Sequence, residues 1–233
     1  MQFSIDQQLL KDHSGLMVGL IILRGGKNAA SPPEIVEALR AAEKKVRNSL
    51  DLETYRDHPN IATLREIHRS FGNNPNKFPP SVQALLKRVL KGGDLPSINT
   101  LVDLYNVISL EHVISAGAED IDAMTGDFRL TYAKGDEEFI ALGETENTPP
   151  AEGEIIYCDD HGVICGKFDW READRTKVTE NSENVVLVLE VCPPVTHDQL
   201  QEVLNELEGL VQKHCGGECT QLILEEAHSE GDA

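Results

Sequence analysis

The chain has 233 residues and a formal net charge of −19 at pH 7, from 21 Lys and Arg residues against 40 Asp and Glu residues. This length is enough to bury a full hydrophobic core, as one large domain or two small ones. The acidic balance argues against simple binding to nucleic acid, because phosphates are contacted by Lys and Arg, and we expect no DNA partner. Hydrophobic residues make up 40% of the chain and charged residues 26%, which is ordinary for a globular protein.

The first residues predict a strand, a short helix and a second strand. Residues 1–6 alternate weakly and predict an edge strand, and Asp6 is placed to cap a short helix through His13. The longest apolar run, residues 15–23, predicts a buried strand, because two glycines interrupt it and no basic segment precedes it. No apolar run is long enough for a membrane span, so we expect no membrane contact and a cytoplasmic location.

Four helices are predicted next, each opened by a start signal. Pro32-Pro33 opens a helix to about residue 50, and shorter helices are predicted over 61–70 and 82–90. The fourth helix, over residues 99–110, is apolar on most sides, which predicts a place in the centre of the fold.

Three polar residues follow one face of that central helix. Asn99, Asp103 and Asn106 are spaced at i, i+4 and i+7, and each needs a hydrogen-bond partner if the helix is buried. In one interpretation they orient an amino group or a water in a pocket. In the other they form a structural network that fixes the helix to the loop at Asn73 and Asn74.

Strand-like patterns dominate after Gly117. Strands are predicted over 128–132, 154–158, 163–168 and 185–191, Thr196 is placed to cap a final amphipathic helix, and 220–224 predicts a last strand. Residues 225–233 contain four acids and no Lys or Arg, which predicts a disordered tail. We therefore expect a single α+β domain over residues 1–224, with a mixed sheet flanked by helices.

The five cysteines have an odd count and no framework spacing, so we expect free buried thiols. His214, Cys215 and Cys219 could form half of a metal site, but the sequence holds no second cluster to complete four ligands. A helix end followed by a glycine turn explains these residues better. No metal and no cofactor is expected.

One segment is basic despite the acidic total. Residues 62–93 carry six basic residues against one acid, Glu66. They could form a patch that binds a tRNA backbone or an acidic partner, or they could be the solvated faces of two helices. The six residues are Arg65, Arg69, Lys77, Lys87, Arg88 and Lys91.

An ordered set of motifs carries a family resemblance. FGNNPNKFPPSVQALLKRV at 71–89 and LPSINTLVDLYNVISL at 95–110 are followed by DID at 120–122, GEIIYCD at 153–159 and FDWR at 168–171. The set resembles the amino-acid-editing, tRNA-binding domain of the bacterial phenylalanyl-tRNA synthetase beta subunit. It is more similar still to free-standing proteins made of that domain alone, and the match runs through residues 15–191 without a break in order.

The resemblance implies the layered α+β fold of that domain and hydrolysis of a wrongly attached amino acid from the 3′ end of a tRNA. Tyr105 and Gly117 stand where the synthetase domain has a pocket-lining threonine and histidine, so its amino-acid specificity does not carry over. A non-catalytic module for an amino-acid-like ligand or a protein partner remains the alternative, and whether the chain is an enzyme stays open. No ATP-binding or aminoacylation motif is present, so the chain is not a complete synthetase. The residues expected at the pocket are Asn99, Asp103, Asn106, Gly117, Asp120, Trp170, Arg171 and Glu172.

Overall fold

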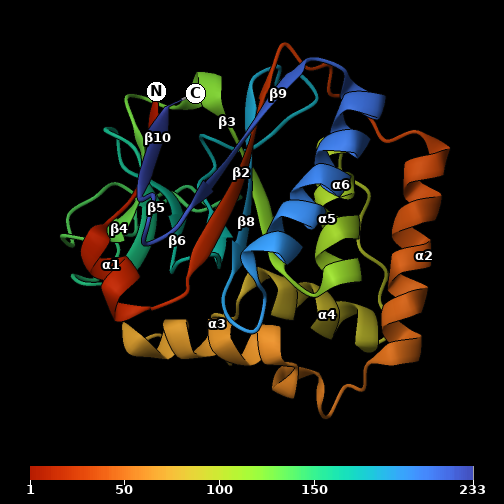
Figure 1. Ribbon diagram of the computed structural model, residues 1–233, viewed down its shortest axis with the longest axis horizontal. Coiled ribbons are helices and arrows are strands. Elements are labelled where there is room, and N and C mark those ends of the chain that lie inside the picture. The colour runs from red at the N-terminus through yellow and green to blue at the C-terminus, as the bar shows by residue number, and fades with distance from the viewer. Residues whose placement is uncertain (233) are drawn as a thin grey trace.

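The computed structural model describes residues 1–232, and two β-sheets form its centre (Figure 1). One sheet is antiparallel, with the order β3-β8-β2-β9. Its strands are β3 (Ser115–Asp120), β8 (Val185–Val191), β2 (Met17–Arg24) and β9 (Glu218–Leu224).

The other sheet is mixed, because β1 and β4 pair in parallel and the remaining neighbours are antiparallel. Its order is β10-β1-β4-β5-β6-β7. The strands are β10 (Glu230–Asp232), β1 (Gln2–Ile5), β4 (Phe128–Tyr132), β5 (Ile155–Cys158), β6 (Val163–Gly166) and β7 (Arg171–Glu172).

Helices cover the antiparallel sheet on the side away from the mixed sheet. The helices α5 (Thr100–His112) and α6 (His197–Cys215) pack on this face, and α2 (Pro33–Ser49) packs outside α5 (Figure 1). The helices α3 (Pro59–Ser70) and α4 (Ser81–Leu90) run across one end of the sheets. A short α1 (Gln7–Asp12) and two 3₁₀ turns, η1 (Tyr55–Asp57) and η2 (Ile121–Ala123), complete the fold.

The central strand β2 separates two hydrophobic cores. Leu20 and Ile22 face the core that the two sheets share, whereas Ile21 and Leu23 face the core with α5 and α6. Successive strand side chains point to opposite faces, so a strand buried on both sides is apolar throughout. This arrangement explains why residues 15–23 read as one continuous apolar run.

The predicted α+β class, with a mixed sheet and flanking helices, is confirmed, and a second, antiparallel sheet accompanies the mixed one. The central position of the helix at 99–110 is also confirmed, since ten residues of α5 are buried. Its cap is Asn99, which accepts a hydrogen bond from the backbone N–H of Val102. Thr196 and Gln199 form a capping box at the start of α6.

Two predictions about the chain's ends are wrong. Residues 230–232 were expected to be disordered, but they form β10 and pair with β1 from Gln2 to Ser4. Because β10 pairs with it on one side and β4 on the other, β1 is not the edge strand that the sequence predicted. Backbone pairing needs no apolar side chains, so an acidic composition does not exclude it. A further expectation also fails, away from the ends: the resemblance implies a loop over residues 116–120 at the pocket, but these residues belong to strand β3.

All five cysteines are free thiols. Within residues 1–232, no helix combines the length and the apolar character that crossing a bilayer requires.

Candidate functional site: an acidic cavity between the sheets

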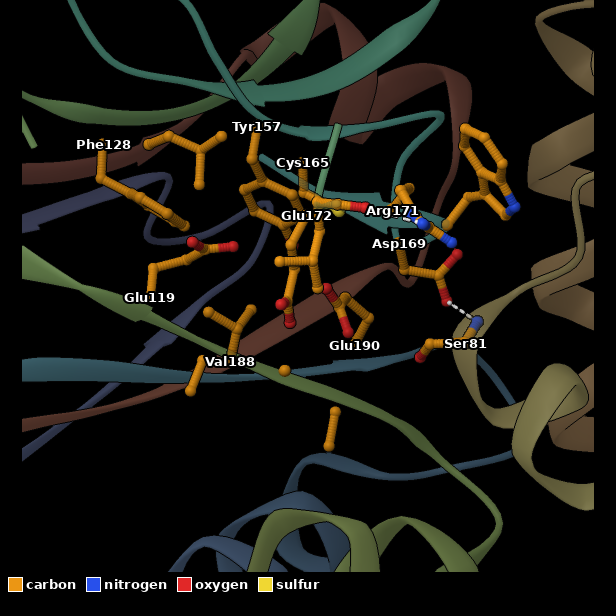
Figure 2. A pocket seen from close by; sticks show the side chains of 16 residues that line it. Ser81, Glu119, Phe128, Tyr157, Cys165, Asp169, Arg171, Glu172, Val188 and Glu190 are labelled. Atoms are coloured by element: carbon orange, nitrogen blue, oxygen red, sulfur yellow. Dashed lines mark hydrogen bonds between the residues drawn. The ribbon is translucent and has the colours of Figure 1, made fainter. Parts of the chain in front are cut away.

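A cavity of about 280 Å³ lies between the two sheets and opens beside the start of α4 (Figure 2). Both sheets contribute to its walls, and the turn before β7 forms its mouth. It is lined by Ser81, Ala116, Gly117, Ala118, Glu119, Phe128, Leu142, Tyr157, Ile164, Cys165, Asp169, Trp170, Arg171, Glu172, Val188 and Glu190.

The wall from the antiparallel sheet is set by the register of β3 and β8. Ser115 pairs with Glu190, Gly117 with Val188, and Glu119 with Val186. Directly paired residues share a face, so Glu119 and Glu190 both face the cavity with Gly117 between them. A Cβ atom added at Gly117 would lie 3.6 Å from Oε1 of Glu172, across the cavity. The missing side chain at Gly117 therefore leaves the middle of the cavity open.

Three buried polar atoms at the cavity have no hydrogen-bond partner among the described residues. They are Oγ of Ser81, Oε2 of Glu119 and the hydroxyl oxygen of Tyr157. Glu119 and Tyr157 are each only 3% exposed. Buried polar atoms in native proteins are normally hydrogen-bonded, because leaving one unpaired costs about 1–3 kcal/mol. Atoms that gather unpaired at one cavity are available to hydrogen-bond a polar ligand or water.

The carboxyl groups in the cavity hold their protons unusually tightly. Burial raises the pKa of Glu190 to about 8, and the nearby Asp169 carboxylate adds to the rise. Burial raises the pKa of Glu172 to about 7, against the opposing charge of Arg171. The pKa of Glu119 is raised well above its usual value by burial and by the charge of Glu172. The positive charge near these carboxyl groups is therefore too small to offset the cost of burying them.

A strained turn holds the mouth of the cavity in place. Lys167 and Phe168 have φ values of 53° and 66°, which side-chain-bearing residues adopt at a cost of about 1–2 kcal/mol. Phe168 is fully buried, and Lys167 is fixed by a 2.6 Å ion pair to Glu154. Such strain persists only where the surroundings over-determine it and is common at functional sites.

Asp169, the next residue of the turn, is held from three sides. Nε2 of His68 donates a 2.7 Å hydrogen bond to it, the backbone N–H of Ser81 donates at 3.3 Å (dashed in Figure 2), and the hydroxyl of Ser115 donates as well. These contacts tie the turn to α3, α4 and β3. Trp170 and Arg171 follow directly and are thereby presented at the mouth.

The mouth combines aromatic rings with cations. Trp170 packs edge-on against Phe78, with ring centroids 4.7 Å apart. The ammonium groups of Lys77 and Lys167 lie 4.8 and 5.2 Å from the centre of the Phe78 ring. Arg171 is exposed and donates a 2.7 Å hydrogen bond to the carbonyl of Leu142.

The polar face of α5 does not belong to this site. Asp103 accepts hydrogen bonds from the hydroxyls of Ser31 and Ser97 and from the backbone of Ile98. Asn99 is the helix cap and also donates to the carbonyl of Val178. Neither residue lines the cavity, nor does Asn106. These residues therefore form a structural hydrogen-bond network, which was the alternative interpretation of their spacing. The network fixes the segments before α2 and α5, and it does not reach the loop at 73–74 as expected.

The remaining expected pocket residues divide between structural and cavity positions. Asp120 caps η2 by accepting from the backbone of Asp122, and it also accepts from the hydroxyl of Ser182. Gly117, Trp170, Arg171 and Glu172 line the cavity.

Sequence reasoning missed Glu119, Glu190 and Tyr157. A signal was present for Glu190, since it is the single charged residue in the apolar strand VVLVLEV. A charged residue inside a strand that is buried on both faces needs a specific explanation. The signal was weaker for Glu119, because Asp120 follows it and two adjacent acids at the end of a segment are typical of an exposed turn.

The predicted basic patch is broken up by the fold. Arg65 is only 8% exposed, and its guanidinium donates to Gln83 and Asn76 inside the protein. Arg69 pairs with Glu66 on the surface. Arg65 thus fixes the loop after α3 and is unavailable to RNA, which corrects that part of the prediction. The residues Lys77, Lys87, Arg88 and Lys91 are exposed.

The raised pKa of Glu190 predicts a pH-dependent stability. Between its usual pKa of 4.5 and its folded value of about 8, the folded protein binds more protons than the unfolded chain. The free energy of unfolding should therefore fall as pH rises from about 5 to about 8. Glu190→Gln cannot ionise, so we expect it to match the wild type near pH 4.5 and to exceed it by about 4 kcal/mol at pH 8. Urea unfolding at both pH values measures this. An exposed control, Glu202→Gln on α6, should show the same dependence of unfolding free energy on pH as the wild type. If Glu190→Gln also shows the wild-type dependence, Glu190 has its usual pKa and the prediction is wrong.

The model of the B3/4 domain family matches residues 64–216. No curated protein matches the chain. Among solved structures, the chain is similar to an N-terminal fragment of the phenylalanyl-tRNA synthetase beta subunit from Pyrococcus horikoshii, with 10% identity and a TM-score of 0.48. That alignment covers 95% of this chain and 53% of the other, so this chain spans about half the length of the fragment.

Proposed function

The chain belongs to the B3/4 domain family, the family of the phenylalanyl-tRNA synthetase beta subunit, and from this premise we propose that it hydrolyses mischarged aminoacyl-tRNA in trans. In this proposal the cavity between the sheets receives the aminoacyl group, and the tRNA end lies at the mouth.

The acidic character of the cavity carries the proposal. Two buried glutamates, Glu119 and Glu190, and the half-buried Glu172 line it, and the one Lys, Arg or His side chain in its lining is Arg171 at the mouth. The amino acid of an aminoacyl-tRNA is attached through its carboxyl group, so its free charged group is the α-ammonium. An ammonium group beside Glu190 would offset the cost of burying that carboxylate and would lower its pKa.

The groups near the mouth fit ester hydrolysis. Glu172 and Arg171 are adjacent in β7, and both line the cavity. A carboxylate with a pKa of about 7 is suited to general base catalysis at neutral pH. Glu172 would take a proton from water as the water oxygen attacks the ester carbon, and would return that proton to the departing ribose oxygen. Arg171 would stabilise the negative oxygen of the tetrahedral intermediate.

The aromatic and cationic residues of the mouth fit the end of a nucleic acid. Trp170 offers a surface on which a base can stack, and Lys77, Lys167 and Arg171 can approach phosphates. We propose these residues as the main RNA contact, in place of the basic patch predicted over residues 62–93. Lys77 belongs to both sets. Contact through so few cations predicts weak binding, with a salt dependence shallower than that of proteins that contact many phosphates.

The second candidate function is a non-catalytic module that binds an amino-acid-like ligand. The net charge of −19 and the burial of Arg65 favour it, because both reduce attraction to RNA. The same cavity would then bind a free amino-acid derivative through its amino group.

A panel of mischarged tRNAs incubated with the purified protein separates the two functions. We expect at least one member of the panel to be deacylated about tenfold or more above its spontaneous rate. If no member is deacylated while amino-acid amides still bind in calorimetry, the protein is a binding module. If neither happens, the cavity is not an aminoacyl site.

A further inference from the structure

The cavity contains more buried carboxylate than one ammonium group can satisfy. Glu190 lies toward the side of Asp169 and Ser81, Glu119 lies at the opposite side, beside Phe128, and Glu172 lies between them (Figure 2). A single α-ammonium near the mouth would leave Glu119 buried with Oε2 unpaired. An unpaired buried carboxylate is costly in either protonation state, so its presence at the inner end needs its own explanation.

The register of β3 and β8 fixes how far apart the two ends are. Glu190 pairs with Ser115, and Glu119 lies four residues further along the same strand. Their backbone positions are therefore about 13 Å apart along the strands, and the side chains reach into the space between. Gly117 occupies the midpoint, where the Glu172 carboxyl group lies opposite it, and the space beside that carboxyl group connects the two ends.

The walls between the two ends are mostly apolar. Val188 pairs with Gly117, and Ile164 and Phe128 approach from the mixed sheet. An aliphatic chain can bury against these residues, which favours its transfer from water at about 0.8 kcal/mol per CH₂ group.

We propose that the cavity selects an amino acid whose side chain is an aliphatic chain ending in a second amino group. This inference rests on the proposed aminoacyl site and names the class of its amino acid. The α-amino group lies beside Glu190, the methylene groups run along the apolar wall formed by Val188, Ile164 and Phe128, and the side-chain ammonium pairs with Glu119. A lysine-like or ornithine-like aminoacyl group has this pattern of charges.

The discriminating probe is a pair of amides that differ in one amino group. Lysinamide carries the second ammonium, whereas norleucinamide has a similar aliphatic chain that ends in a methyl group. At pH 7.5 we expect the wild type to bind lysinamide at least about tenfold more tightly by calorimetry, a difference typical of one satisfied buried charge. Equal affinity for the two amides would overturn the inference.

The variant Glu119→Gln tests the assigned partner. It keeps the size of the side chain and removes a buried charge, so the fold should be retained. Its affinity for lysinamide should fall to that of norleucinamide, while norleucinamide binding stays within threefold of wild type. A variant that retains the wild-type preference would show that Glu119 is not the partner. The control is Glu202→Gln, which is exposed on α6 and should keep the preference.

A third probe separates this inference from the proposed function. The diamine 1,5-diaminopentane presents two ammonium groups without the carbonyl of an aminoacyl group. If it binds as tightly as lysinamide, the two-cation site is supported and a free diamine replaces the aminoacyl group as the ligand. If norleucinamide and other neutral-side-chain amides bind equally well and their tRNA esters are hydrolysed, the aminoacyl site stands and the second cation is excluded.

Discussion

Replacing Glu172 with glutamine is expected to slow deacylation of the preferred mischarged tRNA by about a thousandfold, because general base catalysis contributes about 10²- to 10⁴-fold. Glutamine has nearly the same size but cannot accept the proton of the attacking water. The pKa of Glu172, raised by burial to about 7, is what suits it to that role. Single-turnover deacylation at saturating protein isolates the chemical step from binding.

The accompanying expectation is that binding survives. In Glu172→Gln, the dissociation constant for the preferred amino-acid amide should change less than threefold, since Glu190 remains as a partner of the α-amino group. The matched control is Glu180→Gln, an exposed position outside the cavity, which should deacylate at the wild-type rate. Equal deacylation by Glu172→Gln and the wild type would exclude Glu172 as the base. A parallel loss of rate and affinity would instead give it a binding role.

The second large effect is expected at Gly117. In Gly117→Val, the added side chain enters the middle of the cavity. Its Cβ atom would lie 3.6 Å from Oε1 of Glu172, and its two methyl groups would reach further. The backbone at Gly117 is part of strand β3 with no positive φ, so valine suits the backbone, and its methyl groups displace only the end of the Glu172 side chain. We predict about a hundredfold weaker binding of amino-acid amides, and an equal loss of deacylation, with an unfolding midpoint close to wild type.

Two further glycine variants sharpen this test. Gly117→Ala should give an intermediate loss, because its methyl group fills less of the cavity. Gly209→Val is the control, since its added side chain meets open space on α6. It should leave binding unchanged and should not destabilise α6, because valine has a higher helix propensity than glycine. Unchanged ligand affinity in Gly117→Val would show that the ligand does not cross the midpoint of the cavity.

The local elements could be predicted from the sequence because their signals are local. Thr196 and Gln199 start α6 by bonding each other's backbone groups, and Asn99 starts α5 by bonding Val102. The apolar run of β2 and the mostly apolar surface of α5 also reported their burial correctly. Such signals span a few residues, so no distant contact is needed to interpret them.

The tertiary structure alone decided which polar residues meet. Asn99 and Asp103 matched a site pattern on one helix, but nearby serines and backbone groups satisfy them. Arg65 matched a surface patch, but the loop after α3 folds over it.

The cavity itself follows from strand pairing across long stretches of sequence. Glu119, Glu172 and Glu190 lie on β3, β7 and β8, which belong to two different sheets. The sequence predicted β8, because its apolar content acts within the strand, whereas residues 116–120 of β3 were expected to be a loop and the two-residue β7 was not predicted. Only the register between strands and the packing of the two sheets decided that three carboxylates would face one space, since these depend on contacts that no local pattern encodes.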